Sequence, residues 1–175
     1  DARPHDGRRN SAAHNRYVVD YHCAAWDFAR KQQKPVVRFQ RSGWTGAARC
    51  AQVVWGGDPT TDWGYDGLAS AVRNGLTMGL SGVSLWGSDT GGFFGLSVQL
   101  TPELLQRWIE VGFASGVMRT ESSGAISAGR PQIFDPAVMP IWRRYAKLRT
   151  QLYPYLSAAE AKDYGLVDQV IAKRS

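Results

Sequence analysis

The sequence predicts an α/β fold in which short parallel strands alternate with helices. Short runs rich in β-branched and aromatic residues occur at residues 36–39, 51–55 and 82–86, and a glycine-containing turn follows each run. Segments with apolar residues at helical spacing precede, separate and follow these runs. Because parallel strands require long crossover connections, usually helices, this alternation favours a parallel sheet with helices packed on it.

The expected helices each begin at a polar N-cap residue. They are expected at about residues 12–32 after Ser11, 67–80 after Asp66, 102–111 after Thr101 and 136–153 after Asp135. A proline follows both Thr101 and Asp135, and proline is favoured at the first helical position. Pro35 and Pro154 are predicted to end the first and last helices. Residues 114–130 are rich in Ser and Gly and predict a long loop.

The composition is that of a soluble globular chain and disfavours several functional classes. Apolar residues make up 43% and charged residues 21% of the 175 residues. The net charge of +6 is scattered and no run of five to eight basic residues occurs, so we expect no nucleic-acid partner. No apolar stretch reaches about 18 residues, so we expect no membrane span. No signal peptide is visible, and the expected location is cytoplasmic.

The cysteines and histidines predict no metal site. Cys23 and Cys50 form no CxxC motif, and their spacing indicates neither a disulfide framework nor a zinc site. The three histidines, at positions 5, 14 and 22, have no cysteine or carboxylate at ligand spacing. We therefore expect the chain to bind no metal.

Polar side chains follow the three strand candidates where each strand ends: Arg41, Asp58 and Asp89. Because the carboxyl ends of parallel strands share one edge, where ligands bind, we expect a guanidinium and two carboxylates to converge. Paired carboxylates are the groups that hydrolyse glycosides. The alternative is that each aspartate only forms a turn or caps a helix. The seven tryptophans fit either sugar stacking or core packing.

Three segments carry a family resemblance. They read Phe-Gln-Arg-Ser-Gly-Trp-Thr-Gly at residues 39–46, Val-Trp-Gly-Gly-Asp-Pro-Thr-Thr-Asp-Trp at 54–63, and Gly-Val-Ser-Leu-Trp-Gly-Ser-Asp-Thr-Gly-Gly-Phe at 82–93. They resemble the corresponding segments of glycoside hydrolase family 31. Shorter family-like segments follow in the expected order at residues 103–108, 118–120 and 145–155, so the resemblance covers about residues 10–156.

The resemblance implies that the chain forms the second half of a (β/α)8 TIM barrel, about four β/α units. It implies that Asp58 is the catalytic general acid/base. It also implies that Arg41 and Asp89 bind hydroxyl groups of the sugar at the cleavage site, and that Trp55 and Phe93 line that subsite. The implied reaction is retaining hydrolysis of an α-glycoside or oligosaccharide, without a metal or organic cofactor.

The sequence departs from the family pattern in three places. The family's nucleophile lies in an earlier segment that is not found here, and neither Asp1 nor Asp6 follows a strand, so we expect the nucleophile and the first half of the barrel to be absent. Glu121 stands where the family commonly has a histidine, which makes Glu121 a substrate-binding candidate of changed charge. Residues 157–175 resemble the C-terminal end of the Clp protease proteolytic subunit, so we expect a domain at 1–156 and an unrelated, inactive tail.

Three functional hypotheses follow. The first is a fragment of an α-glucosidase-type hydrolase that is inactive alone because it lacks the nucleophile. The second is a carbohydrate-binding or structural remnant that keeps Arg41 and Asp89 without turnover. The third, a Clp-type serine protease, lacks the serine and histidine context that such an enzyme needs. Because a half barrel exposes strand edges and apolar faces, we expect the chain to associate with itself or with the missing half-barrel.

Overall fold

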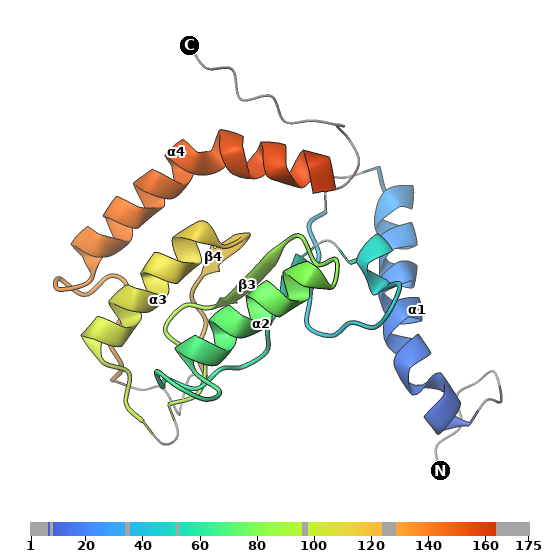
Figure 1. Ribbon diagram of the computed structural model, residues 1–175, viewed down its shortest axis with the longest axis horizontal. Coiled ribbons are helices and arrows are strands. Elements are labelled where there is room, and N and C mark those ends of the chain that lie inside the picture. Colours follow the sequence, from blue (N-terminus) through green and yellow to red (C-terminus); the bar gives the residue numbers. More distant parts are fainter. Residues whose placement is uncertain are drawn as a thin grey trace. The chain divides into compact units, whose positions relative to one another are not determined.

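A computed structural model of the chain describes residues 7, 9–33, 36–51, 53–95, 98–123 and 129–163 (Figure 1). The chain divides into two compact units, Asp1–Trp55 and Gly56–Ser175. The strand pairs described within each unit are parallel, and helices alternate with strands along the chain. The predicted α/β class with parallel strands is therefore confirmed.

The first unit contains one long helix, a short 3-10 helix and one parallel strand pair. Their bounds are α1 Asn10–Lys31, β1 Phe39–Gln40, η1 Ala47–Arg49 and β2 Val53–Trp55. In the strand pair, Phe39 lies opposite Val53 and Gln40 lies opposite Val54. The predicted positions are confirmed, but both strands begin later than expected. Val37, inside the first predicted strand, is 79% exposed and lies outside β1.

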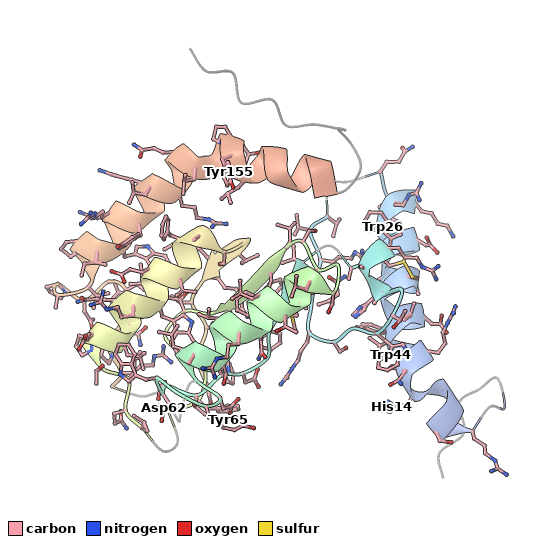
Figure 2. The ribbon with its side chains drawn as sticks, viewed as in Figure 1. His14, Trp26, Trp44, Asp62, Tyr65 and Tyr155 are labelled. Atoms are coloured by element: carbon pink, nitrogen blue, oxygen red, sulfur yellow. A yellow bond between two sulfur atoms is a disulfide. The ribbon has the colours of Figure 1, made fainter. Side chains whose placement is uncertain are left out.

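A disulfide bond joins Cys23 in α1 to Cys50, which directly follows η1 (Figure 2). The expectation of no disulfide is therefore wrong. Sequence spacing does not reveal the bond, because the cysteines are 27 residues apart and meet only when α1 packs against η1. Arg38 reinforces the same junction: its guanidinium donates to the carbonyl of His22 at 2.8 Å and to that of Cys50. The Arg38 guanidinium also lies 5.1 Å from the ring centroid of Trp26.

The large aromatic side chains of α1 are not on its buried face. Helical spacing places Tyr17 and Phe28 on one face of the helix, and each of these side chains is 66% exposed. Val19 and His22 are buried instead, and His22 Nε2 donates to the carbonyl of Ser42 at 2.7 Å. Large apolar side chains gathered on one exposed helix face are typical of a surface that another chain or segment covers.

The second unit contains three helices and one parallel strand pair among its described residues. Their bounds are α2 Leu68–Leu80, β3 Trp86–Asp89, α3 Pro102–Ala114, β4 Val117–Arg119 and α4 Met139–Asp163. In the pair of β3 and β4, Gly87 lies opposite Val117 and Asp89 lies opposite Arg119. β3 begins where the predicted strand at 82–86 ends, and β4 lies inside the predicted loop. Both sequence predictions are wrong here, because pairing with a neighbouring strand, rather than local composition, defines these short strands.

Helix α3 anchors the core of the second unit. Thr101 Oγ1 accepts a hydrogen bond from the amide of Leu104 at 3.1 Å, and Pro102 occupies the first turn, so the predicted helix start is confirmed. The apolar face of α3 is at most 1% exposed and consists of Leu104, Leu105, Trp108 and Ile109. It packs with Trp86 of β3 in one continuous apolar cluster. This cluster holds β3 against the helices that surround it.

Three predicted helix starts are wrong. Ser11 does not cap α1, because it lies inside the helix and the N-cap is Arg9. Asp66 does not cap α2, because the N-cap is Gly67, while Asp66 has a φ of 57° and its amide donates to Ser70 Oγ at 2.9 Å. Asp135 does not begin α4 either. Its carbonyl accepts a hydrogen bond from the amide of Met139 at 2.8 Å and closes a turn that precedes the helix. At Asp66 and Asp135 a turn separates the acidic residue from the helix.

Pro154 does not end the last helix, because α4 continues past it and changes direction along its length (Figure 1). Proline has no amide hydrogen, so a helix that continues through it loses one backbone hydrogen bond and bends. Arg149 ties α4 to the end of α3: its guanidinium donates to the carbonyls of Phe113, Ser115 and Gly116 at 2.8, 2.5 and 2.7 Å. This contact satisfies carbonyl groups that a helix end leaves unpaired.

The predicted boundary after residue 156 falls within α4 and stays a prediction, since residues 164–175 lie outside the described part of the chain. Within the described part, no helix has both the length and the hydropathy needed to cross a bilayer.

We expect reduction of the Cys23–Cys50 bond to destabilise the first unit by about 3 kcal/mol, because the bond closes a chain segment across 27 residues and restricts the unfolded state. Urea unfolding, followed by tryptophan fluorescence with and without dithiothreitol, measures this loss. The Cys23→Ser/Cys50→Ser variant should unfold at the same lower urea midpoint as the reduced protein. Dithiothreitol should not change the midpoint of this variant. An unchanged wild-type midpoint on reduction would contradict the prediction.

We also expect the isolated chain to self-associate through the exposed aromatic face of α1. Sedimentation velocity over a range of concentrations should show a larger species that grows with concentration. The Tyr17→Ser/Tyr21→Ser/Phe28→Ser variant should reduce it, because these side chains are 66, 63 and 66% exposed. The matched control is Arg30→Ser on the same helix. A compact monomer at every concentration would rule the prediction out.

Candidate active site

Two neighbouring segments of the second unit carry Asp58 and Asp89. Backbone contacts join the segments on both sides of the aspartates: the amide of Gly56 donates to the carbonyl of Gly87 at 3.2 Å before them, and Thr60 pairs with Phe94 in a parallel bridge after them. Asp58 and Asp89 therefore lie between these two contacts, on segments that run side by side. This is the arrangement expected of residues at adjacent strand ends.

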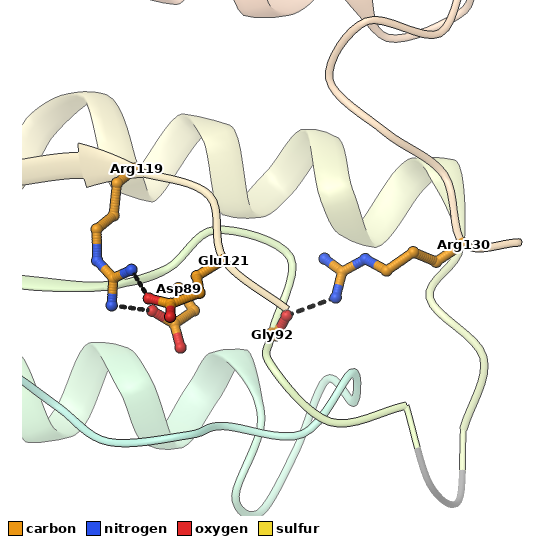
Figure 3. A network of polar contacts seen from close by, with 5 residues as sticks. All are labelled: Asp89, Gly92, Arg119, Glu121 and Arg130. Atoms are coloured by element: carbon orange, nitrogen blue, oxygen red, sulfur yellow. Dashed lines mark hydrogen bonds and ion pairs between the residues drawn. The ribbon is translucent and has the colours of Figure 1, made fainter. Parts of the chain in front are cut away.

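Asp89 is fully buried at the carboxyl end of β3. Its Oδ1 lies 2.5 Å from Nη2 of Arg119, and Nη1 of Arg119 donates to Glu121 (Figure 3). The side chains of Asp89, Arg119 and Glu121 are 0, 24 and 49% exposed, so this ionic row leads from the interior to the surface. The guanidinium compensates a carboxylate charge that would otherwise be costly to bury.

A tight turn of two glycines follows Asp89. Gly91 and Gly92 have φ values of 93° and 80°, which residues with side chains rarely adopt. A Cβ at Gly92 would lie 2.6 Å from the carbonyl oxygen of Thr60, so glycine is required for the close approach of the two segments. The carbonyl of Gly92 accepts a hydrogen bond from Nη1 of Arg130 at 2.7 Å (Figure 3).

Arg130 is 8% exposed, and its hydrogen bond to the carbonyl of Gly92 supports the two-glycine turn. Burial lowers the pKa of Arg130, and the charge of Asp89 raises that pKa in opposition. Together with Thr90, Glu121 and Gln132, Arg130 lines a pocket of about 150 Å³. The pocket therefore borders the ionic row and presents several hydrogen-bonding groups beside it.

Asp58 is half-buried and lines a second, smaller pocket of about 40 Å³. Asp66, Asn74, Ser88 and Trp86 line the same pocket. A half-buried acidic residue beside a pocket with polar lining residues is a candidate for proton transfer.

In the first unit, Arg41 and Trp55 lie together. The guanidinium carbon of Arg41 is 4.9 Å from the ring centroid of Trp55, and the Trp55 ring stacks on that of Phe39 at 6.3 Å. The parallel pairing of β1 with β2 places the ends of these strands side by side, which brings the two residues together. The predicted convergence of Arg41 with the two aspartates stays a prediction, because they belong to separate units.

Phe93 lies in the loop that follows β3, between two other parts of the site. Its ring packs edge-to-face on Phe94, with the centroids 4.7 Å apart. Its amide donates to the carbonyl of Pro59 at 2.7 Å, and its carbonyl accepts from the amide of Ser123 at 3.2 Å. Phe93 therefore connects the segment that carries Asp58 with the segment that carries Glu121.

Sequence reasoning missed Arg119 and Arg130 as site residues. Arg119 lies in the family-like segment 118–120, which is the one signal that pointed to it. Arg130 follows a stretch rich in Ser and Gly without any periodic pattern, and only its contact with Gly92 reveals its role. Among the described residues, no three His, Cys, Asp or Glu side chains cluster in a way that would hold a metal ion.

The second unit thus combines two kinds of chemistry. Asp58 carries a carboxyl beside one pocket, while Asp89, Arg119 and Glu121 provide hydrogen-bond acceptors and donors in the ionic row. Neither group by itself identifies the reaction.

Comparison with known proteins adds what the geometry leaves open. The glycosyl hydrolases family 31 TIM-barrel domain matches residues 1–159. The chain is 31% identical over 156 residues to an α-xylosidase of Emericella nidulans. The aligned region covers 88% of this chain and 19% of that protein. Among solved structures, it is similar to a GH31 family sulfoquinovosidase from E. rectale in complex with an aza-sugar inhibitor, with a TM-score of 0.82 and 28% identity over 92% of this chain and 25% of that one.

A second similar structure is the cycloalternan-forming enzyme of Listeria monocytogenes in complex with a pentasaccharide substrate. Its TM-score is 0.80 at 28% identity, and the match covers 93% of this chain and 16% of that one. The chain spans between 15 and 22% of the length of the first curated relatives it matches. These matches confirm the expected partial TIM barrel.

The comparisons do not support the resemblance of residues 157–175 to the Clp protease subunit. The family match continues to residue 159, past the predicted boundary. Short helical sequences with a glycine and an apolar end occur in many folds, so a match of this length carries little information. The serine protease hypothesis is dropped with it.

We expect Arg119→Gln to destabilise the second unit by about 3 kcal/mol, because the change removes the guanidinium beside the buried charge of Asp89. Urea unfolding measures the loss, and the Asp89→Asn/Arg119→Gln double variant should recover most of it. The matched control is Arg107→Gln, whose ion pair with Glu110 is exposed to solvent, and this change should move the urea midpoint little. Equal losses at the two arginines would contradict the role of the ionic row.

Proposed function

This chain belongs to the glycosyl hydrolases of family 31, within their TIM-barrel domain, and from that premise we propose that it supplies the acid/base part of an active site that hydrolyses α-glycosides. In this proposal the carboxyl group of Asp58 is the general acid and base. The substrate is an α-glucoside or a related oligosaccharide.

The observation that carries the proposal is the position of Asp58 relative to Asp89. The two segments that carry them are joined by backbone contacts before and after the aspartates. One carboxylate is engaged by Arg119 and fully buried, whereas the other lines a pocket and is half-buried. A carboxylate held in an ion pair suits binding, and a carboxyl at a pocket suits proton transfer.

The binding roles are assigned by the same reasoning. Asp89 accepts hydrogen bonds from sugar hydroxyl groups, and Glu121 does so at the outer end of the ionic row. Phe93 in the second unit and Trp55 in the first each carry an aromatic ring of the kind that packs on a pyranose, as the family resemblance implies. Arg41, held over the Trp55 ring, donates hydrogen bonds to neighbouring hydroxyl groups.

The proposed reaction has two steps. In the first, Asp58 protonates the glycosidic oxygen as the bond to the anomeric carbon breaks, while a nucleophilic carboxylate attacks that carbon from the other side. In the second, the Asp58 carboxylate takes a proton from water while the water oxygen attacks the anomeric carbon. This attack displaces the nucleophilic carboxylate and releases the sugar with its configuration retained. Retention requires the nucleophile about 5–5.5 Å from Asp58, and none of the residues assigned above has that role.

The relatives do not decide which sugar is bound. Their names include an α-xylosidase and a sulfoquinovosidase, and one neighbour is described with a pentasaccharide substrate. These names agree in acting on glycosides and differ in the sugar. The proposed substrate therefore stays at the level of an α-linked glucoside or related sugar.

A second candidate function is carbohydrate binding without turnover. The observation that favours it is the ionic row of Asp89, Arg119 and Glu121, which offers hydrogen-bond acceptors and donors to a sugar without any proton transfer. In that case Asp89 and its ionic row keep their roles, while Asp58 has none in catalysis.

In a sample that hydrolyses 4-nitrophenyl α-glucoside, we expect Asp58→Asn to lower kcat/KM by about 10²–10⁴-fold, since nitrophenol departure then lacks an acid. The loss should be much smaller for the 2,4-dinitrophenyl glucoside, because that leaving group departs without protonation. The assay also includes the α-xyloside and the α-sulfoquinovoside. Asp62→Asn is the matched control, because Asp62 lies on the same segment and accepts a hydrogen bond from the amide of Gly64.

An equal loss with both leaving groups would reject Asp58 as the acid. A folded sample that binds α-glucosides saturably but releases no nitrophenol, and whose binding falls in Asp89→Asn, would favour the carbohydrate-binding function instead.

A further inference from the structure

The pocket beside Asp58 contains an indole group that the proposed mechanism does not use. Trp86 is 8% exposed and lines this pocket together with Asp58 and Ser88. Its Nε1 is buried and has no hydrogen-bond partner among the described residues. An indole N–H is a donor only, and leaving it unpaired in the interior costs free energy, so an acceptor at this position is expected.

Two glycines determine how the Trp86 ring lies. A Cβ at Gly56 would lie 3.0 Å from Cζ2 and 3.1 Å from Nε1 of the indole. A Cβ at Gly75 would lie 2.7 Å from Cε3, on the opposite edge of the ring. The ring therefore lies between the two glycines, with its Nε1 edge toward Gly56. Gly56 also lines the pocket of Asp58.

The pocket has the size and polarity that water requires. Its volume is about 40 Å³, whereas one water needs roughly 10–15 Å³. A buried water also needs two to four polar partners. The residues that line the pocket include Asp58, Ser88 and Asn74, which carry a carboxyl, a hydroxyl and an amide group.

We propose that a water bound in this pocket links Trp86 Nε1 to the carboxyl of Asp58, and that Trp86 is a positioning residue for the acid/base. The water accepts its hydrogen bond from the indole, so its own two O–H groups are left to donate. One of them points to Asp58. A donor in this position stabilises the carboxylate that remains after Asp58 has given its proton to the leaving oxygen. This catalytic role rests on the proposed function, but the hydrogen-bonded link itself does not.

Trp108 provides a matched comparison within the same unit. Its Nε1 is also buried without a partner among the described residues, and the side chain is 1% exposed. Trp108 belongs to the apolar face of α3 and lines neither of the two pockets described above. Its indole signal therefore reports burial without the influence of Asp58.

The test is NMR spectroscopy of the full chain with ¹⁵N-labelled tryptophan, which requires no enzyme activity. The indole proton of Trp86 should show a cross-relaxation peak to a long-lived water. Its signal should also shift in the Asp58→Asn variant. The signal of Trp108 should do neither. Trp86→Phe assigns the signal, and a thermal melt of that variant verifies that it folds.

A water peak together with a response to Asp58→Asn at Trp86 alone supports the link. No water peak, or a Trp86 signal that ignores Asp58→Asn, overturns it. If Trp86→Phe does not fold, Trp86 is replaced by benzothienylalanine, which keeps the ring shape but has no N–H. The loss of one indole signal then identifies the signal of Trp86. Because these readouts do not depend on turnover, they can succeed even if the glycosidase proposal fails.

Discussion

The ion pair between Asp89 and Arg119 is the contact on which the second unit's site depends. The two residues lie opposite each other at the carboxyl ends of β3 and β4, and the amide of Thr90 donates to the carbonyl of Arg119 at 3.0 Å just beyond them. A shift of one residue would move the Arg119 side chain to the other face of the strand pair and leave Asp89 without this guanidinium. The ion pair and the backbone register therefore support each other, and Glu121 is oriented as a consequence.

Close backbone approach is the second constraint on the same site. A Cβ at Gly87 would lie 2.7 Å from Cβ of Val117, and one at Gly92 would lie 2.6 Å from the carbonyl oxygen of Thr60. The strand that ends in Asp89 thus approaches its neighbours on both sides more closely than a side chain would allow. This proximity explains how Asp58 and Asp89 come to lie on adjacent segments, one facing a pocket and the other engaged in the ionic row.

The first unit is held together by a different kind of contact. The Cys23–Cys50 bond and the two hydrogen bonds of Arg38 join α1 to the segment that leads into β2. Covalent and polar links take the place of a large apolar core here, because the large side chains of α1 are on its exposed face. The aromatic stack of Trp55 with Arg41 lies at the end of this segment, so the integrity of the junction determines where these two candidates are held.

Local residue patterns determined much of the fold and several residues of the candidate site. The alternation of short strands and helices, the start of α3 at Thr101 and the polar strand ends follow from propensity, capping and periodicity, which act over a few residues. The tertiary structure alone decided the disulfide, strand β4, the partner of Asp89 and the support that Arg130 gives to Gly92. Each of these depends on segments far apart in sequence, and no local pattern encodes which distant groups will meet. The same reason explains the aromatic face of α1: periodicity identifies an apolar face, and only packing decides whether that face is covered.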